Sequence, residues 1–156
     1  MKLSWKRDDG KLSYNDVTID VVCDVRNELN GRRALSEKVV YSELPNGDKG
    51  VPYMPRPFPL GVWNVVAVIP KENPYEAPEF ISTDACQILD VWSVVDGHYG
   101  DKTGDNVEDY GYGLHNSTSA TTLGCGRIVS SKDREDLSKA IKTALLAKEE
   151  VILEVV

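Results

Sequence analysis

Two long apolar runs constrain the fold of this chain more than any other feature. Residues 61–69 and 85–95 are rich in valine, with a tryptophan in each, and the first run ends at Pro70. β-Branched and aromatic residues favour strands, so both runs are predicted to be strands. Weaker alternation predicts one or two short strands over 11–23, and a further strand is expected over 37–43.

The rest of the chain predicts one helix and several loops. Residues 131–148 have helical spacing of apolar positions, and Ser130 or Ser131 can cap the helix. A closing strand is expected over 151–156. Four prolines make 50–59 an extended loop rather than a central strand, and the remaining expectations are a short helix within 25–35 and a loop over 73–78.

These elements predict a single domain over 1–156, mainly β (α+β), with antiparallel strands, one C-terminal helix and a final strand. The net charge of −7 argues against a nucleic-acid partner. No apolar run approaches the roughly 20 residues of a membrane span, and no leader peptide is expected at the N-terminus. We therefore expect a protein made in the cytoplasm.

The segment 112–127 carries the chemistry that the sequence offers. It holds His115, one of two histidines, and Cys125, one of three cysteines, ten residues later. Glycines on both sides of Cys125 let a substrate approach and leave backbone amides available as donors. A thiol with a neighbouring base is a nucleophile, although a cysteine is more often a small buried residue. Cys23 and Cys86 are expected to be buried residues of this second kind.

The acidic segment 96–109 admits two interpretations. The simpler interpretation is a solvated loop. The functional interpretation is a rim of carboxylates over a site, which would suit a substrate that carries a free amino group. Within this segment His98 and Asp101 are candidate substrate-binding residues.

Two stretches resemble the catalytic domain of the L,D-transpeptidases, cysteine enzymes that act on peptidoglycan stem peptides. One is Thr122-Leu-Gly-Cys-Gly-Arg127 downstream of His115, and the other is Phe58-Pro-Leu-Gly-Val-Trp63. The resemblance covers roughly residues 36–156 and implies an L,D-transpeptidase-like β-sandwich or barrel. It needs no cofactor and implies an acyl-enzyme thioester, formed with the stem peptide and resolved by water (a peptidase) or by an amine (a transpeptidase). The spacing from His115 to Cys125 is close to that of short phage-encoded relatives, so a lytic or virion-associated hydrolase acting on the cell wall is expected.

The resemblance also implies roles for individual residues. Cys125 would be the nucleophile and His115 its base, with the amides around Gly124, Cys125 and Gly126 forming the oxyanion site. Asn116 and Ser117 are expected to orient the imidazole, and Tyr112 is expected to contact the substrate. Arg127 is expected to pair with a substrate carboxylate. A structural ion pair is an equally good role for Arg127.

Two other functions remain open. His98, Asp105 and His115 could ligate zinc in a peptidoglycan peptidase, with Glu108 as general base. The chain could also be a non-catalytic wall-binding or virion module, in which Trp63, Trp92 and the tyrosines are sheet residues.

Overall fold

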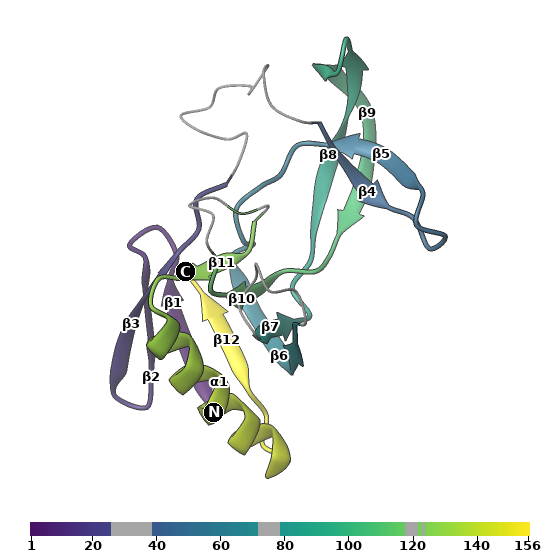
Figure 1. Cartoon of the computed structure of the whole chain (residues 1–156). Coiled ribbons are helices and arrows are strands. Elements are labelled where there is room, and N and C mark those ends of the chain that lie inside the picture. Colours follow the sequence, from purple (N-terminus) through teal and green to yellow (C-terminus); the bar gives the residue numbers. More distant parts are fainter. Residues whose placement is uncertain (26–38, 72–78, 118–121, 123) are drawn as a thin grey trace.

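The computed structural model describes residues 1–25, 39–71, 79–117, 122 and 124–156, and its main body is a closed barrel (Figure 1). The strands follow the order β1-β12-β6-β7-β10-β11-β3-β2 around the wall. Their bounds are β1 Lys2–Lys6, β2 Lys11–Tyr14, β3 Val17–Val22, β6 Gly61–Pro70, β7 Glu79–Thr83, β10 Gly113–His115, β11 Gly126–Ile128 and β12 Ile152–Val155.

A second sheet of four strands extends from the barrel, with the order β4-β5-β8-β9 (Figure 1). Its strands are β4 Val40–Glu43, β5 Lys49–Tyr53, β8 Gln87–Val95 and β9 His98–Asp109. The chain enters this sheet after β3, returns to the barrel for β6 and β7, and re-enters it for β8 and β9. β9 leads back towards the barrel at its C-terminal end, and three residues separate it from β10.

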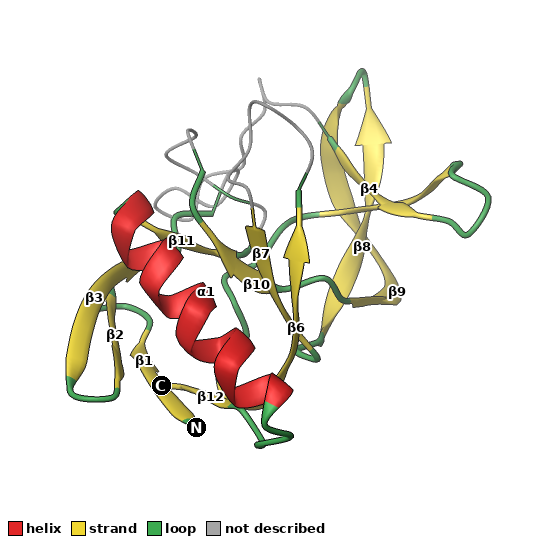
Figure 2. Ribbon diagram, turned by 60° about the horizontal axis from the view of Figure 1, so that its bottom comes forward, coloured by secondary structure: helices red, strands yellow, loops and turns green. Residues whose placement is uncertain are grey.

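The single described helix, α1 (Ser131–Leu146), lies across the barrel (Figure 2). Its N-cap is Ser130, whose side chain accepts a hydrogen bond from the backbone amide of Asp133. This bond satisfies one of the free amides of the first turn. Leu137, Ile141 and Ala144 are buried at helical spacing and join the core cluster of the barrel, so burial of one apolar face holds the helix in place.

The predicted fold class is confirmed: the protein is mainly β, with a C-terminal helix followed by a final strand. The runs 61–69 and 85–95 form the long strands β6 and β8, and 11–23 contains β2 and β3. The barrel is not wholly antiparallel, because β1 pairs with β12 and β10 pairs with β11 in parallel.

The prediction of a loop over 96–109 is wrong, because residues 98–109 form β9, which pairs with β8 over its whole length. Asp96 and Gly97 have φ angles of 50° and 78°, the left-handed conformation of both central residues in a tight hairpin turn. Asp-Gly between two strands is a strong hairpin signal. The acidic composition of the segment concealed it, since most side chains of β9 are exposed and need no apolar alternation.

The expectation that 50–59 holds no internal strand is also wrong, because β5 contains Pro52 and lies between β4 and β8. The sheet can accommodate this proline because β5 pairs with β8 only at Tyr53. Pro52 therefore lies where one side of the strand has no ladder, which is the place a sheet tolerates proline. The helix expected within 25–35 and the loop expected over 73–78 lie almost entirely outside the described residues.

Candidate active site

The pairing of β10 with β11 brings His115 and Cys125 to neighbouring positions. Leu114 pairs with Gly126 and His115 pairs with Arg127, so Cys125, directly before β11, lies beside Gly113. His115 and Cys125 are thus diagonal neighbours on adjacent strands. Such neighbours are roughly 7–8 Å apart at their backbones, within reach of long or aromatic side chains.

Alternation along the two strands turns both side chains away from the barrel interior. Leu114 is fully buried, and the Cβ of an alanine at Gly126 would meet Leu114 and Trp5 inside the barrel. Because successive residues of a strand point to opposite faces, His115 and Cys125 share the outer face. Gly113 has no side chain to come between them.

The two glycines beside Cys125 are required by packing. At Gly126 an added Cβ would lie 2.6 Å from the Leu114 side chain and 2.8 Å from that of Trp5. At Gly124, φ is +123° and an added Cβ would lie 2.6 Å from the Tyr112 ring. The sequence analysis took these glycines as a sign of catalysis, but the close approach of the core explains both of them.

The amide of Gly124, expected in the oxyanion site, already has a partner. It donates to Thr122 Oγ1 at 3.2 Å, and this hydroxyl donates to the carbonyl of Cys125 at 2.7 Å. The amide of Gly113 is a donor that the sequence analysis missed, because its hydrogen bond lowers the pKa of the Cys125 thiol. No signal along the chain links residue 113 to residue 125; only the strand pairing does.

Burial dominates the electrostatics of Cys125 and raises the pKa of its thiol to about 11. The amide of Gly113 and the ammonium of Lys71 act in the opposite direction, whereas Cys23 and Asp109 raise this pKa further. The thiol also donates to the carbonyl of Gly111 at 3.7 Å. Cys125 therefore holds its proton at neutral pH and differs from a cysteine activated as a resting thiolate.

Tyr112, expected to contact substrate, is instead the packing centre behind the site. Its side chain is only 2% exposed, and its ring meets Phe58 edge to face at 5.5 Å between centroids. The hydroxyl donates to the carboxylate of Asp109 and accepts from Gln87 Nε2 at 2.7 Å. Burial, first of all, and the bond to Asp109 raise the pKa of Tyr112. Tyr112 thus joins the barrel to the second sheet.

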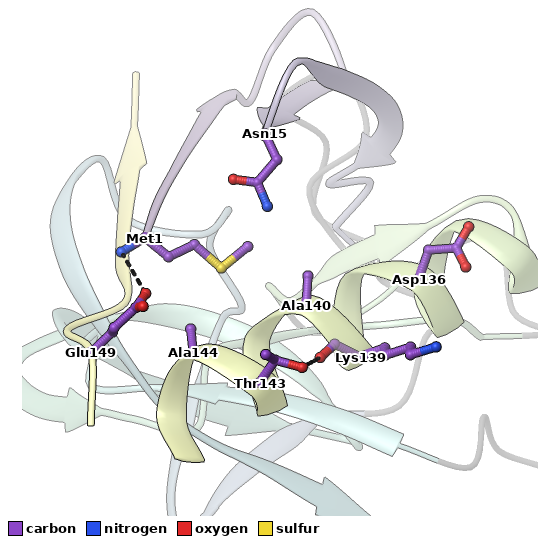
Figure 3. A pocket seen from close by; sticks show the side chains of 8 residues that line it. All are labelled: Met1, Asn15, Asp136, Lys139, Ala140, Thr143, Ala144 and Glu149. Atoms are coloured by element: carbon purple, nitrogen blue, oxygen red, sulfur yellow. Dashed lines mark hydrogen bonds and ion pairs between the residues drawn. The ribbon is translucent and has the colours of Figure 1, made fainter. Parts of the chain in front are cut away.

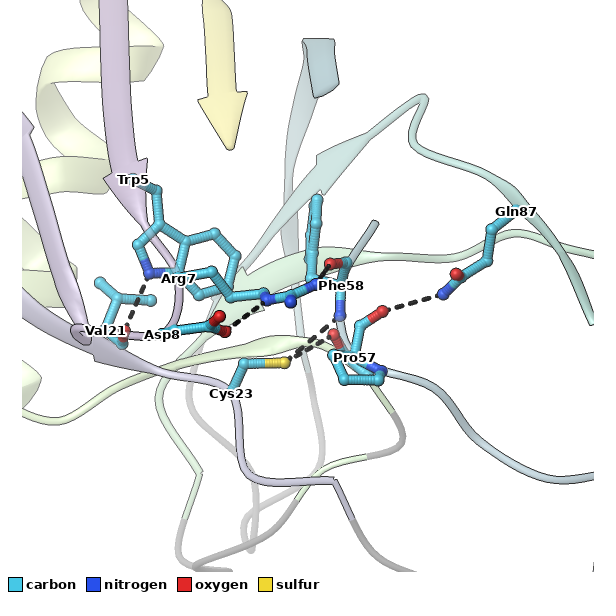
Figure 4. Close-up of polar contacts among 9 residues, drawn as sticks. Trp5, Arg7, Asp8, Val21, Cys23, Pro57, Phe58 and Gln87 are labelled. Carbon is cyan, nitrogen blue, oxygen red and sulfur yellow. Dashed lines mark hydrogen bonds and ion pairs between the residues drawn. The ribbon is translucent and has the colours of Figure 1, made fainter. Parts of the chain in front are cut away.

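Residues 57–58, here called the strap, are held beside the site by polar contacts (Figure 4). Arg7 Nη1 donates to the carbonyl of Phe58 at 2.7 Å, and Gln87 Nε2 donates to that of Pro57 at 2.9 Å. The amide of Phe58 donates to Cys23 Sγ at 3.3 Å, and this thiol donates to the carbonyl of Gly124 at 3.4 Å. Cys23 therefore links the strap to the residue before Cys125, in keeping with a structural role.

The outer face around His115 carries positive charge. The ring of Phe80, on β7, lies 5.7 Å from the His115 ring, and Lys71 Nζ lies 5.1 Å from the Phe80 centroid. Arg127 is paired with His115 across the strands. It forms no ion pair with any described residue, and its Nε is buried without a hydrogen-bond partner among them. This leaves a guanidinium beside the candidate base.

Asn116 was expected to orient the imidazole, but its side-chain amide forms hydrogen bonds with neighbouring segments instead. Its Nδ2 donates to the carbonyl of Ile128 at 2.7 Å, and its Oδ1 accepts from the hydroxyl of Ser131 at 3.2 Å. These bonds tie the end of β10 to the end of β11 and to the start of α1. Ser117 follows as a half-buried residue at the border of the described segment.

His98 and Asp101 are not brought to this site. They lie near the turn of the β8–β9 hairpin, whereas Asp109 lies at the opposite end of β9. A strand advances about 3.3 Å per residue, so Asp101 is roughly 25 Å from Asp109 along it. Across the described ranges no three His, Cys, Asp or Glu side chains gather closely enough to hold a metal ion.

Two cavities among the described residues lie away from this site. A groove of about 480 Å³ runs between α1, Met1 and Asn15 (Figure 3). A smaller one of about 230 Å³ lies on the second sheet beside Trp92 and Lys102. The groove at α1 is lined by alanines and exposed polar side chains, with the ammonium of Met1 facing Glu149. Neither includes a candidate catalytic residue.

The sequence matches no protein-family model, and the chain shows no significant similarity to a curated protein or to a solved structure. Among the described residues no helix is long and apolar enough to cross a membrane.

Proposed function

We propose that this protein is a cysteine-dependent enzyme that acts on peptidoglycan stem peptides through a thioester, as an L,D-transpeptidase or L,D-peptidase. The observation that carries the proposal is the register of β10 and β11, which places His115 and Cys125 on one outer face with Gly113 between them. The guanidinium of Arg127, which forms no ion pair with a described residue, lies on the same face and supports the proposal, since a stem peptide offers carboxylates to bind.

The high pKa of the thiol defines the role of the histidine. Since Cys125 is protonated at neutral pH, His115 acts as a general base and takes the thiol proton while sulfur attacks the donor carbonyl. The carbon–nitrogen bond then breaks, and the same proton passes to the leaving amine. The backbone amide of Gly113, which points at the sulfur, is a donor for the developing oxyanion.

The second half of the reaction decides between the two enzyme types. Water or a free amine attacks the thioester, His115 takes its proton, and the Cys125 thiol is restored. Water yields a shortened stem peptide, and an amine yields a new amide bond. In a phage context the hydrolytic outcome would make the protein a lytic or virion-associated enzyme.

The test is incubation of the purified protein with defined muropeptides, followed by mass spectrometry with and without an added amine acceptor. We expect a change in one peptide bond, and a loss of turnover of roughly 10³-fold or more in Cys125→Ala and in His115→Ala. Cys86→Ala is the matched control, because Cys86 is half-buried and lies outside the β10–β11 face. Muropeptides left intact by the wild type, or turnover that survives Cys125→Ala, would contradict the proposal.

A further inference from the structure

Asp109 is a half-buried carboxylate at the end of β9 that reaches the barrel. It accepts a hydrogen bond from the Tyr112 hydroxyl, and across the strands it pairs with Gln87, which donates to the same hydroxyl. It forms no ion pair with any residue that the structure describes. The carboxylate is thus held in a fixed position while its charge is left uncompensated by these residues.

This carboxylate lies close to the nucleophile. The Tyr112 ring packs against Gly124, where an added Cβ would meet its Cε1 at 2.6 Å, so one phenol ring separates Asp109 from the residue before Cys125. On the other side, Cys125 Sγ contacts the carbonyl of Gly111, two residues after Asp109. Asp109 and the thiol are therefore linked through the Tyr112 ring and through the segment 109–111, and the charge of Asp109 acts on the thiol.

The charge of Asp109 shifts the pKa of neighbouring groups. It raises the pKa of Cys125, and it adds to burial in raising the pKa of Tyr53 to about 12. Burial also raises the pKa of Asp109 itself, while the Tyr112 hydroxyl favours its charged form. In partly buried surroundings such a charge acts more strongly than it would in water.

We propose that Asp109 makes the approach to Cys125 selective for a positively charged group, and that it pairs with the free ammonium of the acyl donor's diamino acid. The donor's identity rests on the proposed function; the charge selection does not. Arg127, on the His115 side, would meet a carboxylate of the same donor. A zwitterionic residue is then oriented across the thiol by one group of each sign.

The first experiment measures charge selection without turnover. Cys125 is modified with two thiosulfonate reagents of similar size, one carrying a trimethylammonium group and one a sulfonate, and its rate is read by peptide mass mapping. The ratio of the two rates cancels any change in the thiolate fraction. We expect the wild type to favour the cationic reagent, and Asp109→Asn to lower this ratio by about fivefold or more.

Two variants control the experiment. Asp109→Glu keeps the charge and should restore most of the ratio. Asp105→Asn removes an exposed charge from the same strand, about 13 Å away along it, and should leave the ratio nearly unchanged. An unchanged ratio in Asp109→Asn, or an equal fall in Asp105→Asn, would overturn the proposal.

The second experiment uses muropeptides whose side-chain amine is free or acetylated. The wild type should prefer the free amine in kcat/KM, and Asp109→Asn should lose about the same fivefold preference. If the wild type turns over neither donor, the proposed function fails while the reagent ratio still decides the role of Asp109. Discrimination that persists in Asp109→Asn would overturn that role.

Discussion

The barrel and the second sheet hold their residues in different ways. The barrel has a continuous apolar core in which Leu3, Trp5 and Leu153 are fully buried, and α1 adds its apolar face to the same cluster. The buried side chains of the second sheet, such as Leu89 and Tyr99, stay outside that cluster. Large apolar residues of this sheet are exposed, including Ile88 at 60%.

This difference assigns each region a part of the candidate site. Cys125 and His115 are held because the residues beside them in sequence are packed inside the barrel. Asp109 and Tyr53 belong to the second sheet, and the charge of Asp109 raises the pKa of the Cys125 thiol. The barrel therefore fixes the candidate reacting groups, and the second sheet supplies the negative charge of Asp109 near them.

The largest expected effect on stability comes from removing a core side chain next to the site. Leu114→Ala should cost about 2–5 kcal/mol of unfolding free energy, because it leaves a cavity between β10 and the Gly126 position. Ile88→Ala, in the second sheet, should change stability by less than about 0.5 kcal/mol. Denaturant unfolding of both variants is the measurement. Equal losses would show that the second sheet is packed as tightly as the barrel.

A second test concerns the junction of the two regions, where burial raises the pKa of Cys125 from 9.0 to about 11. The folded protein holds this proton more tightly, so near pH 7 its thiolate fraction should be about a hundredfold below that of an unperturbed thiol. The rate of Cys125 alkylation by iodoacetamide should therefore keep rising up to about pH 11. A plateau near neutral pH would instead reveal a thiolate already paired with His115.

The smallest expected effect lies on the exposed face of the second sheet. Lys102 Nζ is 3.1 Å from the Asp90 carboxylate and 5.6 Å from the Trp92 centroid. Both charged side chains are half exposed or more, so the pair is screened by water. Asp90→Ala should change the unfolding free energy by no more than about 1 kcal/mol. A larger loss in denaturant unfolding would mean that this sheet relies on its surface charges.

The sequence predicted the parts of the fold whose signals are local. The valine-rich runs became β6 and β8, and the spacing after Ser130 became α1, because the apolar pattern and the cap act over a few residues. β9 was missed because its strand character comes from pairing with β8. The strand character of β1 likewise comes from pairing, and its partner β12 is about 150 residues away in the chain.

The candidate site shows the same limit. Cys125 and His115 could be singled out by residue type and resemblance, but their placement on one face depends on the parallel register of β10 and β11. Gly126 was read for its chemistry, although the side chains of Leu114 and Trp5 explain it. Asp109 was one acid among several until the hydrogen bond from Tyr112 distinguished it.

The position of β12 between β1 and β6 has a consequence for how the protein is made. During synthesis the segment with His115 and Cys125 leaves the ribosome before β12, so the barrel wall is still open when both residues are already present. The barrel can close only when residue 2 contacts residue 152. Contacts between residues so far apart in the sequence make folding slow. A nascent chain therefore carries its candidate nucleophile without the finished wall, and assembly of the site is tied to the synthesis of β12.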